Sequence, residues 1–527
     1  MKKISKTSII ICIFLIVTVL YPLYEMLIRV EWSDFSKLVS SNGFKEALSN
    51  SIFVTTIATI ISVSLAFLLA FALNRTNIKH KAILKVLLTL PMLIPSISHG
   101  LGLINLFGAN GIISKIFGFN IIGSTGIIIG SVIYSFPVAF LLLDDGFRYV
   151  DNNMYDTAHV LGLNKIQTFK KVTFCYLKKP LFSAIFASFT LIFTDYGVPL
   201  AIGGKFTTLP VFLYKEVIGL LNFSKGTMIG LFLLVPAIIS FLFDTIAKDY
   251  SANDSDIKKY RINEYKLRDR FYTIFVYFVI VTVLIILSSF VYYAFIKNFA
   301  LDHSFSLIHF DRINNDNVIR NIINSLIIAI FVSIIGTIIS YFSAYTTARS
   351  KVKGAKLIHM LTIMSLAIPG IVLGLSYTIS FSGSFIYNTF IILIIVNIVH
   401  FIASPYLMAY NALQKVNPNF EAVAKTCNIP KLKLIKDIII PCTKKTIREM
   451  FSYFFVNSMV TISAITFLFN TKTMPLSLLI NNYEGSMMLE EAAIISLIIL
   501  IINVIIKLSV YFINRKEERS EINESNI

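Results

Sequence analysis

The stretch "NSIFVTTIATIISVSLAFLLAFALNRTNIK", residues 50–79, decides the fold because a second stretch repeats it. "NSLIIAIFVSIIGTIISYFSAYTTARSKVK", residues 324–353, aligns with it without a gap. Each contains an apolar run long enough to cross the roughly 30 Å hydrocarbon layer of a membrane as a helix. Such an alignment predicts an internally duplicated membrane protein. Apolar matches are expected between any two spans, but polar and charged residues also coincide: Asn50 with Asn324, Ser51 with Ser325, Arg75 with Arg349 and Lys79 with Lys353.

Apolar runs of this length recur along the whole chain. Of its 527 residues 56% are hydrophobic and only 14% are charged, and the mean hydropathy is +0.76. Because lipid cannot satisfy backbone polar groups, these runs are expected to be helices. We expect an all-α integral membrane protein with about 12 transmembrane helices, arranged as two parallel six-helix repeats. The expected spans are residues 7–28, 49–73, 83–107, 123–146, 181–203, 226–247, 271–296, 322–347, 357–380, 386–410, 450–470 and 489–513.

The repeat divides the chain into two halves of the same orientation. Residues 1–247 form the first half and residues 271–513 the second, each with six spans. The segment 248–270 between them is polar and charged, which is typical of a cytoplasmic linker. The last residues, 514–527, are expected to form a disordered cytoplasmic tail.

The net charge of +18 orients the chain in the membrane. If the amino terminus is cytoplasmic, the inside segments hold 35 of the 47 lysines and arginines. This asymmetry follows the positive-inside rule and predicts a multi-pass protein of the cell membrane, embedded in the lipid bilayer with both termini in the cytoplasm. No basic patch with interleaved aromatic residues remains, so no nucleic-acid partner is expected.

None of the four cysteines faces outside in this topology, and free thiols are expected at Cys12, Cys175, Cys427 and Cys442.

Two cytoplasmic loops carry a second sign of the repeat. "YDTAHVLGLNKIQTFKKVTFC", residues 155–175, lies in the loop 147–180, and "EAVAKTCNIPKLKLIKDIIIPC", residues 421–442, lies in the loop 411–449. Aligning the two places Gly162 on Asn428. Gly and Asn most readily adopt the left-handed conformation that ends a helix. Each loop is therefore predicted to form a short helix, a turn, and a second helix that leads into the next span.

This arrangement resembles the permease subunit of ATP-binding-cassette (ABC) importers, whose signature loop reads E-A-A, three residues, Gly, nine residues and I-x-L-P. At that spacing the first loop has D-T-A, Gly162 and V-T-F-C, and the second has A-V-A, Asn428 and I-I-I-P. Asp156 thus replaces the Glu, Cys175 the Pro and Asn428 the Gly. The chain looks like the fused, twelve-span permeases of the type I group that imports ferric iron, 2-aminoethylphosphonate or thiamine. Its segments "TDYGVPLAIGG" (194–204) and "TISAITFL" (461–468) are similar to segments there.

The resemblance implies a transport subunit rather than an enzyme. A separate ABC ATPase homodimer would dock on the two loops, and an extracytoplasmic solute-binding protein would deliver the cargo. ATP and Mg would bind in the ATPase, and no cofactor is expected in this chain, which contains no G-x-x-x-x-G-K-[ST] phosphate-binding loop. The residues expected to couple to the ATPase are Asp156, Ala158, Gly162, Glu421, Ala422, Ala424, Asn428 and Pro441.

Candidate substrate-path residues lie in or beside the apolar spans. A carboxylate in a membrane is costly and often marks a pathway, which makes Asp195, with its neighbour Tyr196, a candidate. The alternative is that Asp195 sits at the membrane interface. Four residues of the repeat are expected to bend or shape the third span of each half, where they either line a path or only pack the repeat. These are Pro95, Gly100, Pro369 and Gly374.

Other polar residues favour structural roles. His99, Asn105 and His400 are expected to hydrogen-bond between helices. An outer cluster of His303, His309, Asp302 and Asp311 matches no spacing of metal ligands, so no metal site is expected.

The alternative function is an ion-coupled secondary transporter built from two six-span halves. Such a transporter needs membrane-embedded acids or bases for coupling, and apart from Asp195 and the histidines the spans contain few. A membrane enzyme is less favoured still, because the sequence shows no paired carboxylates and no nucleophile–base pair.

Overall fold

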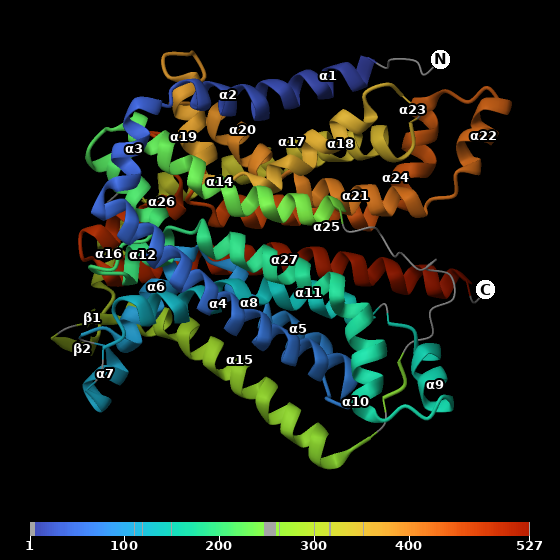
Figure 1. The fold of residues 1–527 in the computed structure, drawn as a ribbon, viewed down its shortest axis with the longest axis horizontal. Coiled ribbons are helices and arrows are strands. Elements are labelled where there is room, and N and C mark those ends of the chain that lie inside the picture. The colour runs from blue at the N-terminus through green and yellow to red at the C-terminus, as the bar shows by residue number, and fades with distance from the viewer. Residues whose placement is uncertain are drawn as a thin grey trace.

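The computed structural model describes residues 6–109, 111–118, 120–148, 150–246, 260–262, 264–299, 301–315, 318–350 and 352–525. Most of these residues are helical, and a short antiparallel pair of strands, β1 (Ile296–Asn298) and β2 (Asp302–Phe305), lies at one end of the molecule (Figure 1). The prediction of an all-α membrane protein is confirmed.

Many of the elements recur in the two halves, although the halves differ in detail. In the labels below, η marks a 3-10 or π turn. The first half contains α1 (Lys6–Leu15), η1 (Ile16–Leu20), α2 (Tyr21–Ile28), α3 (Trp32–Ser40), α4 (Asn42–Arg75), α5 (Lys81–Leu88), η2 (Leu90–Leu93), α6 (Ser96–Phe107), α7 (Ile112–Phe117), α8 (Ser124–Arg148), α9 (Asn152–Val160), α10 (Lys165–Thr168), η3 (Phe169–Thr173), α11 (Phe174–Phe193), α12 (Gly197–Ile202), α13 (Leu209–Tyr214), η4 (Lys215–Gly219) and α14 (Phe223–Ile246). The second half contains α15 (Lys266–Ala294), α16 (Ile308–Asn315), α17 (Val318–Ala348), α18 (Ala355–Met364), η5 (Ser365–Ala367), α19 (Gly370–Phe381), α20 (Phe390–Phe401), α21 (Ala403–Lys415), α22 (Asn419–Thr426), α23 (Lys431–Leu434), η6 (Ile435–Ile439), α24 (Ile440–Cys442), α25 (Lys444–Val460), α26 (Leu476–Gly485) and α27 (Leu489–Ser525).

The predicted duplication is confirmed by these bounds. A shift of 274 residues carries α6 onto α19 at both ends, and a shift of 266 residues carries the π turn η3 onto η6. The shift that aligns the two halves changes from 274 to 266 residues between the third and fifth spans. In this region α8 of the first half corresponds to the bent pair α20–α21 of the second half.

Several of the twelve expected spans are bent or interrupted in the structure. Among the described residues, seven helices are long and apolar enough to cross a membrane alone, and two further pairs would cross as bent spans. The pair formed by residues 355–367 and 370–381 bends by 111°, and Pro369 lies at the break. Residues 461–470 leave the helix altogether. The expected span 181–203 is also displaced, because a continuous helix runs from Lys165 to Phe193 and therefore includes part of the loop.

Helix α4 illustrates how the sequence builds the core. Small residues recur on its buried face, among them Ala58, Ser62 and Ala66. They let α8 approach closely, and the Ser135 hydroxyl of α8 donates to the Ser62 hydroxyl over 2.9 Å. Close packing of small residues is a main source of helix association in lipid, where apolar burial gives no driving force.

The two halves are interlocked, because the first and last spans of each half pack against the third span of the other. At the top of Figure 1, α2 lies beside α19, and the Tyr377 hydroxyl donates to the Thr18 carbonyl over 2.6 Å. At the bottom, α15 lies against α5 and α6, and the Tyr293 hydroxyl donates to the Asn105 carbonyl over 2.7 Å. The Asn503 amide of α27 likewise donates to the Leu93 carbonyl over 2.9 Å.

The carboxyl-terminal segment is a helix where disorder was expected. Helix α27 continues to Ser525, and side-chain contacts hold it through residue 517. The Arg448 guanidinium donates to Asn514 over 2.7 Å and pairs with Glu517, to which Lys444 also lies within 3.4 Å. The charged composition of the segment reflects this pairing with α25. Of the expected linker 248–270, residues 248–259 and 263 lie outside the described residues.

Candidate functional site

Two short helical loops project from the same end of the bundle. Helices α9 and α22 lie at the right of Figure 1, at the end where α1 begins and α27 ends. We call residues 152–168 the first loop, residues 419–434 the second loop, and this end of the bundle the loop end. In each loop the first helix ends at a left-handed residue, Gly162 with a φ of 70° and Asn428 with a φ of 54°. The predicted helix, turn and second helix are confirmed.

Local polar contacts fix the shape of the first loop. The Asp151 carboxylate accepts from the Asn153 amide over 3.0 Å and caps α9. Asn164 and Gln167 form a reciprocal capping box at the start of α10. The exposed Asp156 accepts a hydrogen bond from Asn152 over 2.9 Å.

Some of the predicted coupling residues are buried against the bundle, and others are exposed. Ala158 and Ala424 occupy equivalent positions and are buried against the rest of the chain, with exposed fractions of 2% and 5%. Their small side chains bring each helix close to its own bundle. The equivalent pair Asp156 and Ala422 is exposed, as are Gly162, Asn428 and Pro441.

Exposed apolar side chains on the loops are a feature that the sequence analysis missed. Val160 and Leu161 are 84% and 71% exposed, and Ile166 is 68% exposed. Leu432, which is equivalent to Ile166, is 77% exposed. In the sequence, the signal for this feature was the pair of apolar residues, Ile166 and Leu432, at equivalent positions of the two loops.

An arginine at the end of α4 or α17 holds each loop. Arg349 donates from Nε and Nη2 to the two carboxylate oxygens of Glu421, and from Nη1 to the Leu413 carbonyl over 2.9 Å. Its equivalent, Arg75, is 4% exposed and donates to the Phe147 carbonyl over 3.2 Å. Where Glu421 stands in the second loop, the first has Tyr155, whose hydroxyl accepts from Arg75 over 3.5 Å.

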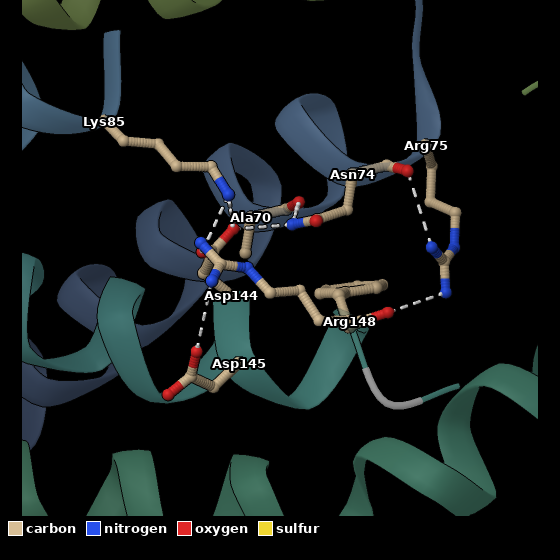
Figure 2. A network of polar contacts seen from close by, with 8 residues as sticks. Ala70, Asn74, Arg75, Lys85, Asp144, Asp145 and Arg148 are labelled. Carbon is tan, nitrogen blue, oxygen red and sulfur yellow. Dashed lines mark hydrogen bonds and ion pairs between the residues drawn. The ribbon is translucent and has the colours of Figure 1, made fainter. Parts of the chain in front are cut away.

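A buried ion network joins three helices next to the first loop (Figure 2). Asp144 of α8 is 2% exposed and accepts from Lys85 of α5 over 2.6 and 2.8 Å. It also accepts from Asn74 and from Arg148, each over 2.7 Å. Three donors thus satisfy a carboxylate that would be costly to bury alone.

The site in the second half that corresponds to the Asp144 network contains a histidine and tyrosine rings instead of a carboxylate. His359 stands where the first half has Lys85, and its ring lies 5.6 Å from that of Tyr406 and 5.2 Å from that of Tyr410. At the tip of the second loop, partial burial lowers the pKa of the Lys431 ammonium, which lies 5.0 Å above the ring of Tyr345.

A row of buried and partly buried side chains crosses between the halves. Tyr196 is 1% exposed, and its hydroxyl donates to the Thr466 hydroxyl of the other half over 3.2 Å. Its ring stacks on Tyr214 at 5.3 Å, and the Tyr214 hydroxyl accepts from Asn481 over 3.3 Å. We call Tyr196, Tyr214, Thr466 and Asn481 the seam.

Asp195, the chain neighbour of Tyr196, makes its hydrogen bonds within the first half. Its carboxylate caps α12 by accepting from the Gly197 and Val198 amides over 3.3 and 3.0 Å. It also lines a small pocket, together with residues of the first half such as Ser131 and Thr208. The structure therefore separates the two adjacent candidates, since Tyr196 hydrogen-bonds to the other half whereas the hydrogen bonds found for Asp195 among the described residues stay within the first half.

The proline and glycine candidates shape the third spans. Pro95 and Pro369 stand at the amino ends of α6 and α19. A Cβ on Gly100 would lie 2.7 Å from the Ala201 Cβ, and a Cβ on Gly374 would lie 2.7 Å from the Ala464 carbonyl. Both glycines therefore allow close packing onto the segment that follows the fifth span.

The remaining polar candidates are built into the fold. The His99 ring contacts its own helix at the Pro95 carbonyl over 3.2 Å. His400 lies against Gly370, and Asn105 contributes its backbone carbonyl to Tyr293. In the outer cluster, His303 contacts Tyr292 and Lys115. His309 contacts Glu491 and the Lys297 carbonyl, so the two outer histidines belong to separate networks.

Comparison with known families accounts for the duplicated architecture. Residues 58–300 and 336–519 match the model of the binding-protein-dependent transport system inner membrane component. The chain belongs to this family. It is a fused, two-half permease of the type I ABC importer class, and the match favours this class over the alternative of an ion-coupled transporter.

Individual relatives agree with the two-half organisation. The chain is 25% identical over 497 residues to the ferric transport system permease protein FbpB of Actinobacillus pleuropneumoniae, covering 88% of this chain and 71% of that protein. It is 24% identical over 496 residues to the FbpB 1 protein of Haemophilus influenzae, covering 88% and 78%. The molybdate/tungstate transport system permease protein WtpB of Methanocaldococcus jannaschii is 25% identical over 242 residues, which cover 45% of this chain and 96% of that protein. One half of this permease thus corresponds to nearly the whole of a shorter one.

Proposed function

We propose that this permease forms the membrane pathway of an ATP-driven importer of ferric iron. The cargo is supported by the similarity to two FbpB proteins over 88% of the chain. The family name implies a binding protein that delivers the cargo, which we place at the end of the bundle opposite the loops. We place both termini, and the loop end that carries them, in the cytoplasm, because the lysines and arginines gather on that side.

The coupling proposal rests on the paired loops. A bundle of membrane helices contains nothing that senses ATP, so a rigid projecting element must carry the closure of an ATPase to it as a rigid-body shift. The first and second loops are such elements, because arginines and buried alanines hold each loop against its own half. Exposed Ile166 and Leu432, at equivalent positions, give each loop an apolar contact for one subunit of an ATPase homodimer.

The pathway itself is assigned to the seam. In a transporter made of two similar halves, the solute crosses where the halves meet and rock against each other. Tyr196 and Thr466 meet there in a buried contact, which closes the route in this structure. Asp195 is assigned to the fold of the first half, since it caps α12.

The test is uptake by the reconstituted complex. Permease, ATPase and binding protein are placed in liposomes, and ATP-dependent uptake is measured for radiolabelled ferric iron and for molybdate, each loaded on the binding protein. We expect ATP-dependent uptake of ferric iron and no uptake of molybdate. ATP-dependent uptake of molybdate without iron would contradict the cargo, and uptake of iron that needs no ATPase would contradict the coupling.

A further inference from the structure

The two loops are anchored to the bundle by different means. In the second loop, Ala424 belongs to a large buried cluster that includes Tyr341, Tyr345 and Leu413. In the first loop, Ala158 is buried with only Val150 and Val172, against the partly buried Tyr155 and Leu163. The first loop therefore has much less apolar contact with its own half.

Two further anchors of the second loop are not repeated among the described residues of the first half. The Arg349–Glu421 ion pair becomes Arg75 and Tyr155, so the buried guanidinium of Arg75 contacts no carboxylate within the described part of the chain. Lys431 stacks on Tyr345 of α17, but the residue equivalent to Tyr345 is Phe71, whose ring contacts Phe147 and Tyr272.

The end of the linker supplies the missing contacts. The ring of Tyr260 lies 4.2 Å from the guanidinium carbon of Arg75 and 4.8 Å from the ring of Tyr155. The ring of Tyr265 lies 4.9 Å from the ammonium of Lys165, the residue equivalent to Lys431. Aromatic faces attract cations, so each ring replaces a partner that the second half provides from within.

Backbone and side-chain hydrogen bonds fix the same segment. The Arg261 amide donates to the Asn152 side chain at the start of α9 over 3.0 Å. Glu264 accepts from Asn77, just after α4, over 2.7 Å. Linker residues 260–265 thus contact both ends of the first loop and the arginine behind it, as far as these residues are described.

We propose that the linker residues Tyr260, Arg261, Glu264 and Tyr265 hold the first loop in place, in a role that the second half fills with its own residues. The linker is then part of the first docking surface and not only a tether between the halves. Its consequence for transport rests on the proposed docking function, whereas the anchoring itself is a property of this chain alone.

The test uses spin labels at equivalent positions of the two loops. Leu161 in the first loop is equivalent to Cys427 in the second, and both are exposed. One reporter carries Leu161→Cys with all four native cysteines changed to serine. The other keeps Cys427 and changes the remaining three. The test variant is Tyr260→Ala with Tyr265→Ala, and the control is Tyr260→Phe with Tyr265→Phe, which keeps both rings. Full-length permease is labelled in liposomes.

The alanine variant is expected to lose the slow component of the label spectrum at residue 161 and to leave the spectrum at Cys427 unchanged. The phenylalanine variant should match the parent at both positions. An unchanged spectrum at residue 161, or an equal change at both positions, would overturn the proposal.

Transport measured on the same variants separates this inference from the docking function. A mobile first loop with reduced ATP-dependent uptake supports both. A mobile first loop with normal uptake supports the anchoring by the linker and contradicts the docking role of the first loop.

Discussion

At the scale of single residues, the two halves solve one problem with different chemistry. Both must hold a helical loop through an arginine at the end of their second span, and they use a carboxylate in one case and tyrosine rings in the other. Arg349 and Glu421 are mostly buried, with side chains 5% and 24% exposed. A pair of this kind lies between exposed pairs, worth up to about 1 kcal/mol, and buried pairs, whose disruption costs about 3–5 kcal/mol.

Glu421→Gln is therefore expected to lower the free energy of unfolding by roughly 2 kcal/mol, because it leaves the Arg349 charge without its partner. It should also slow ATP-dependent uptake. The matched variant is Tyr155→Phe, which removes one 3.5 Å hydrogen bond to Arg75 and keeps the ring. Denaturant unfolding in micelles and uptake in liposomes measure both. Equal effects of the two variants would argue against the ion pair as the anchor of the second loop.

The turn residues give a prediction that depends on the backbone alone. Gly162 has a φ of 70°, and a Cβ there would meet no atom within 4 Å. Gly162→Ala should cost about 1–2 kcal/mol, the penalty for a side chain in the left-handed region. Gly162→Asn should cost less, since Asn428 occupies the equivalent position. Thermal unfolding compares the two, and an alanine variant as stable as the parent would show that the turn can relax.

These two turn residues were predictable from sequence, and the anchors were not. Gly and Asn adopt the left-handed backbone conformation more readily than other residues. Their alignment therefore predicts a turn even when the residues that surround it in the fold are unknown. Tyr260 and Tyr155 acquire a role only by facing Arg75, which is distant in sequence from both. The spacing of the loop signature contains no information on that contact.

At the scale of helices, the network around Asp144 determines how the first loop is carried. Asp144 joins α8 to α4 and α5 only a few residues before α9 begins. A shift of α9 is thereby passed to three helices together, and the network acts as a rigid joint between loop and bundle.

Asp144→Asn is expected to lower the free energy of unfolding by about 3 kcal/mol, because it leaves the partly buried Lys85 charge unpaired. The control is its neighbour Asp145→Asn. The Asp145 side chain is 70% exposed and lies 3.8 Å from Arg148, so a change within about 0.5 kcal/mol is expected. Denaturant unfolding of the two variants in micelles checks the difference. A similar cost for both would show that burial of Asp144 contributes little.

Helix continuity was the least predictable property at this scale. Residues 450–470 read as one apolar run, yet the helix ends at Val460 and the following residues pack against Gly374 of α19. Hydropathy reports how apolar a segment is and does not report whether it stays helical. Within the membrane, a segment can be non-helical where protein rather than lipid surrounds its backbone.

At the scale of the whole molecule, we assign the substrate pathway to the seam. Loss of the side-chain contacts in the seam should therefore open the pathway. Tyr196→Ala removes the stack on Tyr214 and the hydrogen bond to Thr466. We expect raised ATP hydrolysis without the binding protein, because the two halves separate more easily. Tyr196→Phe keeps the stack and should show a much smaller rise. Basal ATPase rates in liposomes measure both. Unchanged hydrolysis in the alanine variant would place the gate elsewhere.

The arrangement of the halves could be predicted only in part. Matched polar residues such as Asn50 and Asn324 predicted the duplication and its parallel orientation. They did not predict that the outer spans pack on the other half. Lipid-facing and protein-facing sides of these helices are both apolar, so periodicity does not identify the partner of a helix.

The interlocked spans have a consequence for how the protein is made. Helix α6 emerges from the ribosome long before α15 and α27, which pack against it from the second half. The first half must therefore wait in the membrane, with the sides of α6 that face α15 and α27 uncovered, until the second half has been synthesised and inserted. Fusion into one chain guarantees that the covering helices arrive at the same place and in equal number.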